Sequence, residues 1–172
     1  MEFYELIKNR YSVRSFTGER VRKEALDKIL EAAHLAPTGC NFQPQRILVL
    51  NTPEAIEKLQ KCTRSHFGAP TALLVCYNKD ECWTRKYDDA LSGPIDACIV
   101  ATHMLLAAEN EGVGCTWIMH FDPFKMREEF NIPENVIPVA LLVMGYAADD
   151  AKPHPYHSQF RDMNETVKYD TF

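Results

Sequence analysis

Apolar residues recur at helical spacing in five stretches of the chain. In one stretch, for example, Leu26, Ile29 and Ala33 fall on a single face, which is typical of an amphipathic helix. The pattern predicts helices over residues 3–10, 22–35, 52–64, 95–111 and 122–131. The fourth of these is apolar almost all round, and such a helix is normally covered by the rest of the protein on every side.

Short, solidly apolar runs alternate with these helices. They predict strands over residues 47–50, 72–77, 115–119 and 139–146. Strands without a polar face indicate a sheet that helices cover on both sides. We therefore expect an α+β protein, a three-layer α/β/α sandwich whose central mixed sheet has helices on both faces.

Residues 147–172 form the least periodic part of the chain. They nevertheless carry four large aromatic residues: Tyr156, Phe160, Tyr169 and Phe172. We expect an extended C-terminal tail that packs on a partner subunit, within a single domain spanning residues 1–172.

Composition narrows the class of protein. The chain has 172 residues, 46% of them hydrophobic and 25% charged, which suits one folded domain. A net charge of −5 disfavours a nucleic acid or an anionic membrane as partner. Without a basic-then-apolar leader or an apolar run of about 20 residues, the protein is expected in the cytoplasm. Six irregularly spaced cysteines, with no Cys-x-x-Cys pair, indicate buried thiols rather than a metal site.

A local basic cluster follows the first helix. Arg10 and Arg14 are four residues apart, with Ser12 between them. A guanidinium group matches phosphate oxygens in shape and charge, and a serine hydroxyl adds a donor. The cluster is interpreted either as an anion site or as a solvated basic turn.

A turn-rich segment between two prolines, residues 36–44, is the second candidate. Its amides at Asn41 and Gln43 could bind the edge of a heterocycle, because they both donate and accept hydrogen bonds. An ordinary loop from helix to strand is the alternative.

Two further segments are ambiguous by themselves. Gly112 and Gly114 imitate a dinucleotide fingerprint, but Trp117 stands in the place of the third glycine and the segment follows a helix. A Rossmann phosphate loop is therefore excluded, and the glycines are interpreted as a helix stop. Arg161, near the end, would alone indicate a solvated charge.

Taken together, these segments resemble the nitroreductase family of flavin enzymes. The first matches that family's Arg-x-Ser-x-Arg, and the second its Ala-Pro-Ser-x-x-Asn-x-Gln-Pro with Thr38 in the serine place. The third is similar to its Gly-x-Gly-x-x-Trp-Ile, followed by a Gly-Tyr pair at Gly145. The closing Arg-x-x-x-Glu-x-Val begins at Arg161. The resemblance spans nearly the whole chain in the right order.

The resemblance implies a site for FMN at the interface of a homodimer. By it, the phosphate is held within the segment Arg10, Tyr11, Ser12 and Arg14, and Arg161 closes over it. The isoalloxazine ring is approached from the partner subunit by Pro37, Thr38, Gly39, Asn41 and Gln43. The other side of the ring faces Thr116, Trp117 and Ile118.

The resemblance also implies a reaction. An FMN-dependent oxidoreductase would take hydride from NADH or NADPH and then reduce a nitroaromatic, a quinone or a similar electrophile in the same place, by a ping-pong mechanism. The flavin carries the chemistry, so no catalytic acid, base or nucleophile is assigned. An FMN-binding storage or redox-sensing module without turnover is the alternative.

Three departures from the family pattern stand out. Met119 and His120 replace the small residues that often follow Trp-Ile. The residues that contact the flavin's pyrimidine edge in many members are missing, and Arg64 or His66 could substitute for them. The chain is short, so residues 78–92 are the expected source of any small lid.

Overall fold

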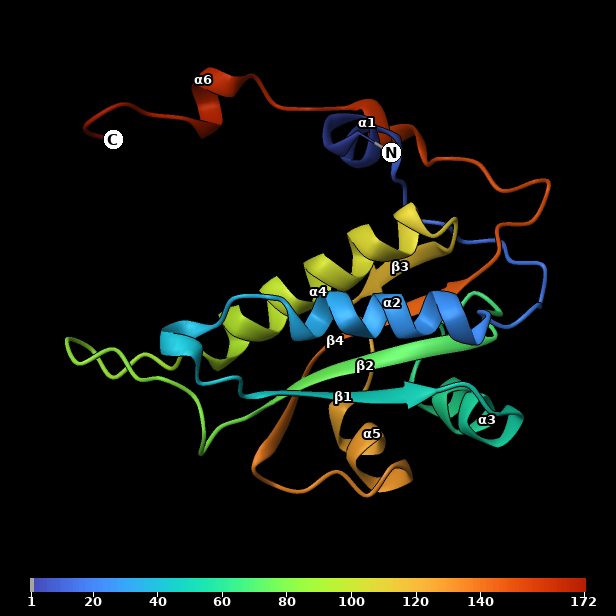
Figure 1. Ribbon diagram of the computed structural model, residues 1–172, viewed down its shortest axis with the longest axis horizontal. Helices are drawn as coiled ribbons and strands as arrows, with labels where there is room; N and C mark the ends of the chain where they lie inside the picture. The colour runs from blue at the N-terminus through green and yellow to red at the C-terminus, as the bar shows by residue number, and fades with distance from the viewer. Residues whose placement is uncertain (1) are drawn as a thin grey trace.

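Residues 2–172 are described by a computed structural model of the chain. Its centre is a four-stranded sheet with the order β1-β2-β4-β3, in which each strand pairs antiparallel with its neighbour (Figure 1). The strands are β1 (Gln45–Leu50), β2 (Thr71–Asn78), β3 (Gly114–Ile118) and β4 (Val136–Gly145). The helices are α1 (Phe3–Asn9), α2 (Lys23–His34), α3 (Pro53–Cys62), α4 (Gly93–Asn110), α5 (Pro123–Glu129) and α6 (Met163–Thr166), with 3-10 turns η1 (Gly39–Asn41) and η2 (Pro155–Ser158).

Two hydrophobic cores lie on opposite faces of the sheet. Leu73 and Val75 of β2 point to a core that includes α2 and α4, whereas Leu74 between them points to a core that includes α3 and α5. Successive side chains of a strand alternate between faces, so a strand buried at every position needs cover on both. This confirms the α+β class and the three-layer sandwich.

The sheet is less mixed than expected. All three strand pairs are antiparallel, and the parallel component is an isolated bridge between Ser12 and Cys115. That bridge attaches the segment after α1 to β3, at the edge of the sheet.

Strand β4 begins earlier than predicted. The predicted strand started at residue 139, which left Pro138 outside it, and proline removes a donor from the ladder. In the structure it lies opposite Cys76, where the register between β2 and β4 shifts. A bulge leaves a position without regular pairing, and this irregularity accommodates the proline.

Helix α4 is not covered on every side, contrary to the expectation from its composition. Its buried residues include Ala97, Val100 and Met104. A stripe along the opposite face stays accessible: Ile95 is 64% exposed, and Ile99 further along is half-buried. An apolar stripe on a central helix marks a surface that another chain could cover.

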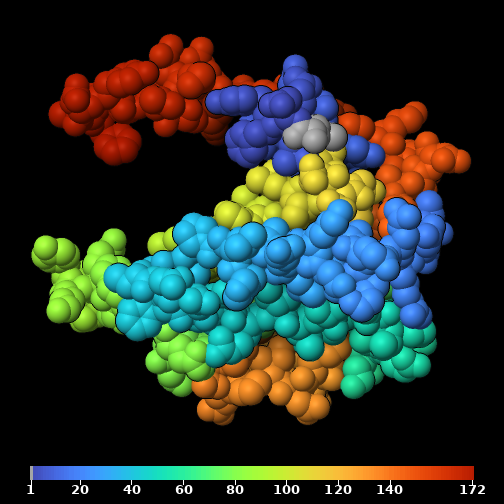
Figure 2. Space-filling model, in the orientation of Figure 1, coloured from blue at the N-terminus to red at the C-terminus, as the bar shows by residue number. Residues whose placement is uncertain are grey.

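The C-terminal tail extends away from the body of the protein. Figure 2 shows an open gap between the end of the tail and the helical layer. Phe160 and Tyr169 are 87% and 85% exposed. The prediction that this tail packs on a partner subunit stays a prediction.

Residues 78–92 form no helix. They run out and back as an arm that a bridge between Thr84 and Leu91 closes (Figure 1), and Arg85 pairs with Asp88 within it. None of the helices in the described part of the chain is both long enough and apolar enough to cross a membrane.

Candidate functional site at the edge of the sheet

The segment that carries the two arginines lies extended along β3. The backbone N–H of Val13 donates to the carbonyl of Cys115 at 3.3 Å, and the hydroxyl of Thr116 donates to the carbonyl of Val13. Val13 is buried, at 2% exposure. Residues two apart in an extended segment share a face, so Arg10, Ser12 and Arg14 face away from the sheet.

Gly114 permits this close approach. A Cβ at Gly114 would lie 2.9 Å from a methyl carbon of Val13, and real side chains do not come that near. Gly112, by contrast, has φ +69°, the left-handed conformation of a helix C-terminal cap. The helix-stop interpretation therefore fits Gly112, whereas Gly114 makes room for the arginine segment.

Arg10, Ser12 and Arg14 line a pocket of about 300 Å³. Its other walls come from the beginning of the tail, and the lining consists of Arg10, Ser12, Arg14, His154, Tyr156 and His157. Two guanidinium groups, a hydroxyl and two imidazoles form a set of donors suited to a phosphate or a similar anion. None of the residues 2–172 contributes a carboxylate to this lining.

The tail residues of this pocket were not predicted as site residues. The backbone N–H of Tyr156 donates to Nδ1 of His154 at 3.2 Å, which leaves Nε2 as the nitrogen available to a ligand. The ring of His157 packs edge-on against Tyr11, with 6.4 Å between ring centroids. In the sequence, these histidines are notable only for their spacing of three.

Arg161 lies outside the pocket lining. Its guanidinium pairs with Glu165 at 3.2 Å, and its side chain is 78% exposed. The role expected for it, closing over a phosphate, stays a prediction.

Glu109, in the last turn of α4, lies close enough to Arg10 for their charges to interact. Burial raises the pKa of Glu109, and the positive charge of Arg10 opposes that rise. The arginine segment thus lies at the C-terminal end of α4.

The second predicted segment, residues 37–43, lies at the other end of α4. Asp96, only 2% exposed, accepts hydrogen bonds from the N–H of Gly39 at 2.8 Å and from the hydroxyl of Ser92 at 2.7 Å. A buried carboxylate requires such partners, so the loop is fixed to the first turn of the helix.

The loop itself is tightly turned. Cys40, Asn41 and Gln43 all have positive φ angles, between 48° and 58°, which is uncommon for residues with side chains. The hydroxyl of Thr38 accepts from the N–H of Gln43 at 3.0 Å and holds the turn closed. The side chains of Asn41 and Gln43 are exposed and available to a ligand outside this chain.

The two halves of the expected site do not meet within one chain. Asp96 and Glu109 mark their positions along α4, and thirteen helical residues correspond to about 20 Å. Figure 1 shows the η1 loop near the N-terminal end of α4, far from the C-terminal end of the same helix. Within one chain, the two sets therefore lie toward opposite ends of α4.

The side chains of β3 are less exposed to a ligand than expected. Thr116 and Ile118 are buried at 3% and 5% exposure, and Trp117 packs partly into the core. Any contact of Thr116 and Ile118 with a ligand would therefore be through the backbone. The next two residues differ, because Met119 is 70% exposed and His120 is exposed as well.

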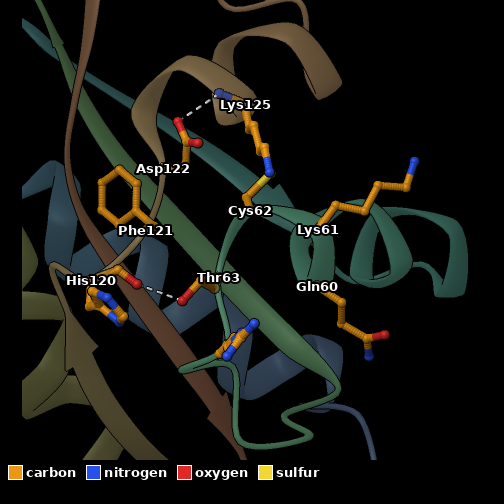
Figure 3. Close-up of a pocket in the computed structure, with 9 residues that line it drawn as sticks. Gln60, Lys61, Cys62, Thr63, His120, Phe121, Asp122 and Lys125 are labelled. Atoms are coloured by element: carbon orange, nitrogen blue, oxygen red, sulfur yellow. Dashed lines mark hydrogen bonds between the residues drawn. The ribbon is translucent and has the colours of Figure 1, made fainter.

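A larger cavity, of about 640 Å³, adjoins His120 (Figure 3). It lies between the end of α3 and the start of α5, and was not predicted as a whole. Its lining residues are Gln60, Lys61, Cys62, Thr63, Arg64, His120, Phe121, Asp122 and Lys125.

Arg64, one of the two proposed substitutes for a flavin contact, lines this cavity. His66, the other, accepts a hydrogen bond from the N–H of Gly68 at 3.0 Å. Arg14 lies over the ring of Phe67, with its guanidinium carbon 5.9 Å from the centroid. The loop after α3 thus lies next to the arginine segment.

Among residues 2–172, no three His, Cys, Asp or Glu side chains are grouped so that they could hold a metal ion. Anion-binding groups lie toward one end of α4, and an amide-rich loop lies toward the other.

Comparison with known proteins identifies the family. A family model described as the nitroreductase family matches residues 7–67 and 65–146. The crystal structure of a nitroreductase family protein from Clostridium difficile 630 is 41% identical, with a TM-score of 0.94 over 100% of both chains. A protein of Methanothermobacter thermautotrophicus, provisionally named an NADH dehydrogenase/NAD(P)H nitroreductase, is 30% identical over 87% of this chain and 80% of its own length. An FMN-dependent nitroreductase from Clostridium difficile R20291 is 26% identical, with a TM-score of 0.79 over 99% of this chain and 100% of that one.

These matches cover the arginine segment, the amide loop and all four strands. The chain belongs to the nitroreductase family.

Proposed function

We propose that this protein is an FMN-dependent oxidoreductase that takes hydride from NADH or NADPH and reduces a nitroaromatic, a quinone or a similar electrophile. The family and the names of its relatives support NAD(P)H-dependent oxidoreduction with FMN. The acceptor class and a ping-pong order, in which donor and acceptor use the same place in turn, are the finer parts of the proposal.

The residues present fit the phosphate end of FMN. Arg10, Ser12 and Arg14 project from one face of an extended segment into the same pocket, and this array is the observation that carries the proposal. Hydrogen bonds to charged groups contribute roughly 1.5–3 kcal/mol each. His154 and His157 add two imidazoles at the pocket wall.

When bound, FMN would supply the two-electron chemistry, and the protein would bind and orient the reactants. The phosphate pocket would fix one end of the cofactor, and the amides of Asn41 and Gln43 would bind the ring from the partner subunit. Met119 and His120, exposed at the end of β3, would limit the size of an acceptor beside the ring.

A homodimer is part of the proposal. It would bring the amide loop of one subunit to the arginine segment of the other, whereas within one chain the two segments lie toward opposite ends of α4. The accessible apolar stripe on α4, with Ile95 and Ile99, and the exposed aromatic residues of the tail support an extensive interface. Burial of apolar area favours association by about 25 cal/mol per Å².

Two measurements test the function. Mass spectrometry of the flavin released by heat should detect FMN, and recovery of FAD would contradict the phosphate assignment. Anaerobic mixing of the yellow protein with NADH or NADPH should bleach the flavin within seconds. Indifference to both nucleotides would favour a storage or redox-sensing module without turnover.

A further inference from the structure

The 640 Å³ cavity between α3 and α5 has an excess of positive charge. Its charged side chains are Lys61, Arg64, Lys125 and the single carboxylate Asp122. The protein as a whole has a net charge of −5. A concentration of cations in one hollow of an acidic protein favours an anionic ligand there.

The carboxylate of the cavity is already engaged. Oδ1 of Asp122 accepts hydrogen bonds from the N–H groups of Phe124 and Lys125, at 3.0 and 3.1 Å, as the cap of α5. Burial raises the pKa of the Cys62 thiol, so this residue stays neutral and adds no negative charge near pH 7. The lining therefore carries three cationic side chains against one carboxylate, an excess of positive charge.

Two of the three cations, Arg64 and Lys125, are available to a ligand. The third, Lys61, already pairs with Glu129 at 3.1 Å. No ion pair joins Arg64 or Lys125 to a carboxylate anywhere in residues 2–172. Figure 3 shows the side chain of Lys125 extending from the start of α5 toward Cys62.

The cavity borders the proposed ring site through His120. The carbonyl of His120 accepts from the hydroxyl of Thr63 at 2.6 Å, and Nδ1 of His120 lies 3.3 Å from Oγ of Ser65. These contacts fix the residue that follows Met119 against the loop after α3 (Figure 3). A molecule that reaches the end of β3 can therefore also extend into the cavity.

We propose that this cavity binds the phosphate groups of the dinucleotide electron donor, with Arg64 and Lys125 as the contacting cations. The proposal rests on the proposed function, in which NADH or NADPH donates hydride beside β3. The pocket of Arg10 and Arg14 is assigned to the FMN phosphate, so the donor's phosphates need a second cationic site. This cavity is cationic and adjoins the place where the donor must react.

Binding of adenosine 2′,5′-bisphosphate to the FMN-loaded wild-type protein gives a direct test that does not depend on turnover. Calorimetry at low salt should detect binding, and affinity should fall as salt rises, because exposed charges are screened. The variants Arg64→Gln and Lys125→Gln should each weaken binding by roughly fivefold, given the discount for solvent exposure. Lys23→Gln, a surface cation on α2, is the matched control and should bind as the wild type does.

Anaerobic stopped-flow measurements distinguish the two phosphate sources. A weaker apparent affinity for NADPH alone in Arg64→Gln/Lys125→Gln assigns the cavity to a 2′-phosphate, and an equal loss for NADH and NADPH assigns it to the shared pyrophosphate. Either result supports the proposal.

Unchanged affinity for the bisphosphate and for both donors in the double variant would overturn it. Loss of FMN absorbance from the double variant would overturn it as well, because the cavity would then hold part of the flavin. Failure of the proposed function is a separate result. In that case, neither NADH nor NADPH would bleach the flavin bound to the wild-type protein.

Discussion

The hydroxyl of Thr116 donates a hydrogen bond to the backbone carbonyl of Val13. Thr116 lies in the middle of β3 and is 3% exposed, so the bond forms away from water. It joins the edge strand of the sheet to the segment that carries the phosphate-binding arginines. The position of Arg10 and Arg14 therefore depends on a buried residue that does not itself line the phosphate pocket.

Replacing Thr116 with valine keeps the shape of the side chain and removes the donor. The carbonyl of Val13 then loses a partner, and an unsatisfied buried group costs about 1–3 kcal/mol. Thr116→Val should lower the free energy of unfolding in urea by this amount and should weaken FMN binding in a fluorescence titration. Thr171→Val, exposed near the C-terminus, should change neither, and wild-type FMN affinity in Thr116→Val would show that the bond does not position the segment.

Arg10→Ala and Arg14→Ala should each weaken FMN binding roughly tenfold or more, since 1.4 kcal/mol corresponds to a factor of ten. Circular dichroism should stay native, because Arg14 is exposed and Arg10 only half-buried. Arg20→Ala removes an exposed arginine outside the pocket and serves as the control. If all three variants retained FMN equally, the phosphate would lie elsewhere.

Two truncations separate the roles of the tail. Deleting residues 153–172 removes His154 and His157 together with the exposed aromatic residues, and it should abolish FMN binding and dimerisation together. Deleting residues 160–172 keeps both histidines but removes Arg161, and it should weaken the dimer while retaining more FMN than the shorter chain. Sedimentation and flavin absorbance measure the two properties, and a yellow dimer after the longer deletion would show that the tail is dispensable.

The buried thiols provide a test that depends on pH. Burial raises the pKa of Cys76 and of Cys115 to about 12, so both remain protonated at pH 8 and should react with iodoacetamide only after unfolding. Thiols in the unfolded chain ionise near pH 9, so the folded state binds more protons between about pH 9 and 12. The free energy of unfolding should therefore fall as pH rises through that window. Labelling of Cys115 in the folded protein would contradict its burial.

Local pattern was sufficient to predict the layers of the fold and to single out Arg10, Ser12 and Arg14 as one local cluster. Helical and strand periodicities are properties of short segments, and the burial of both faces of β2 follows from its apolar residues. Apolar composition could not show that one stripe of α4 stays uncovered. A helix face that packs on a partner chain and one that packs in the protein's own core are both made of apolar residues.

The parts of the site that were missed depend on contacts between distant segments. His157 reaches the arginine pocket through a packing contact with Tyr11, more than 140 positions away in the sequence. The cavity beside His120 forms where the end of α3 meets the start of α5. Neither pairing leaves a periodicity in the sequence.

In the proposed dimer, each FMN site combines the arginine segment of one subunit with the amide loop of its partner. Co-expression of two differently tagged inactive chains, Arg10→Ala/Arg14→Ala and Asn41→Ala/Gln43→Ala, tests it most directly. In the mixed dimer, one site should carry all four substitutions and the other none, so the purified mixed dimer should bind about one FMN per two chains and regain NAD(P)H oxidation. A mixed dimer with no more FMN or activity than either parent would contradict a shared site, because both halves of the site would then belong to the same chain.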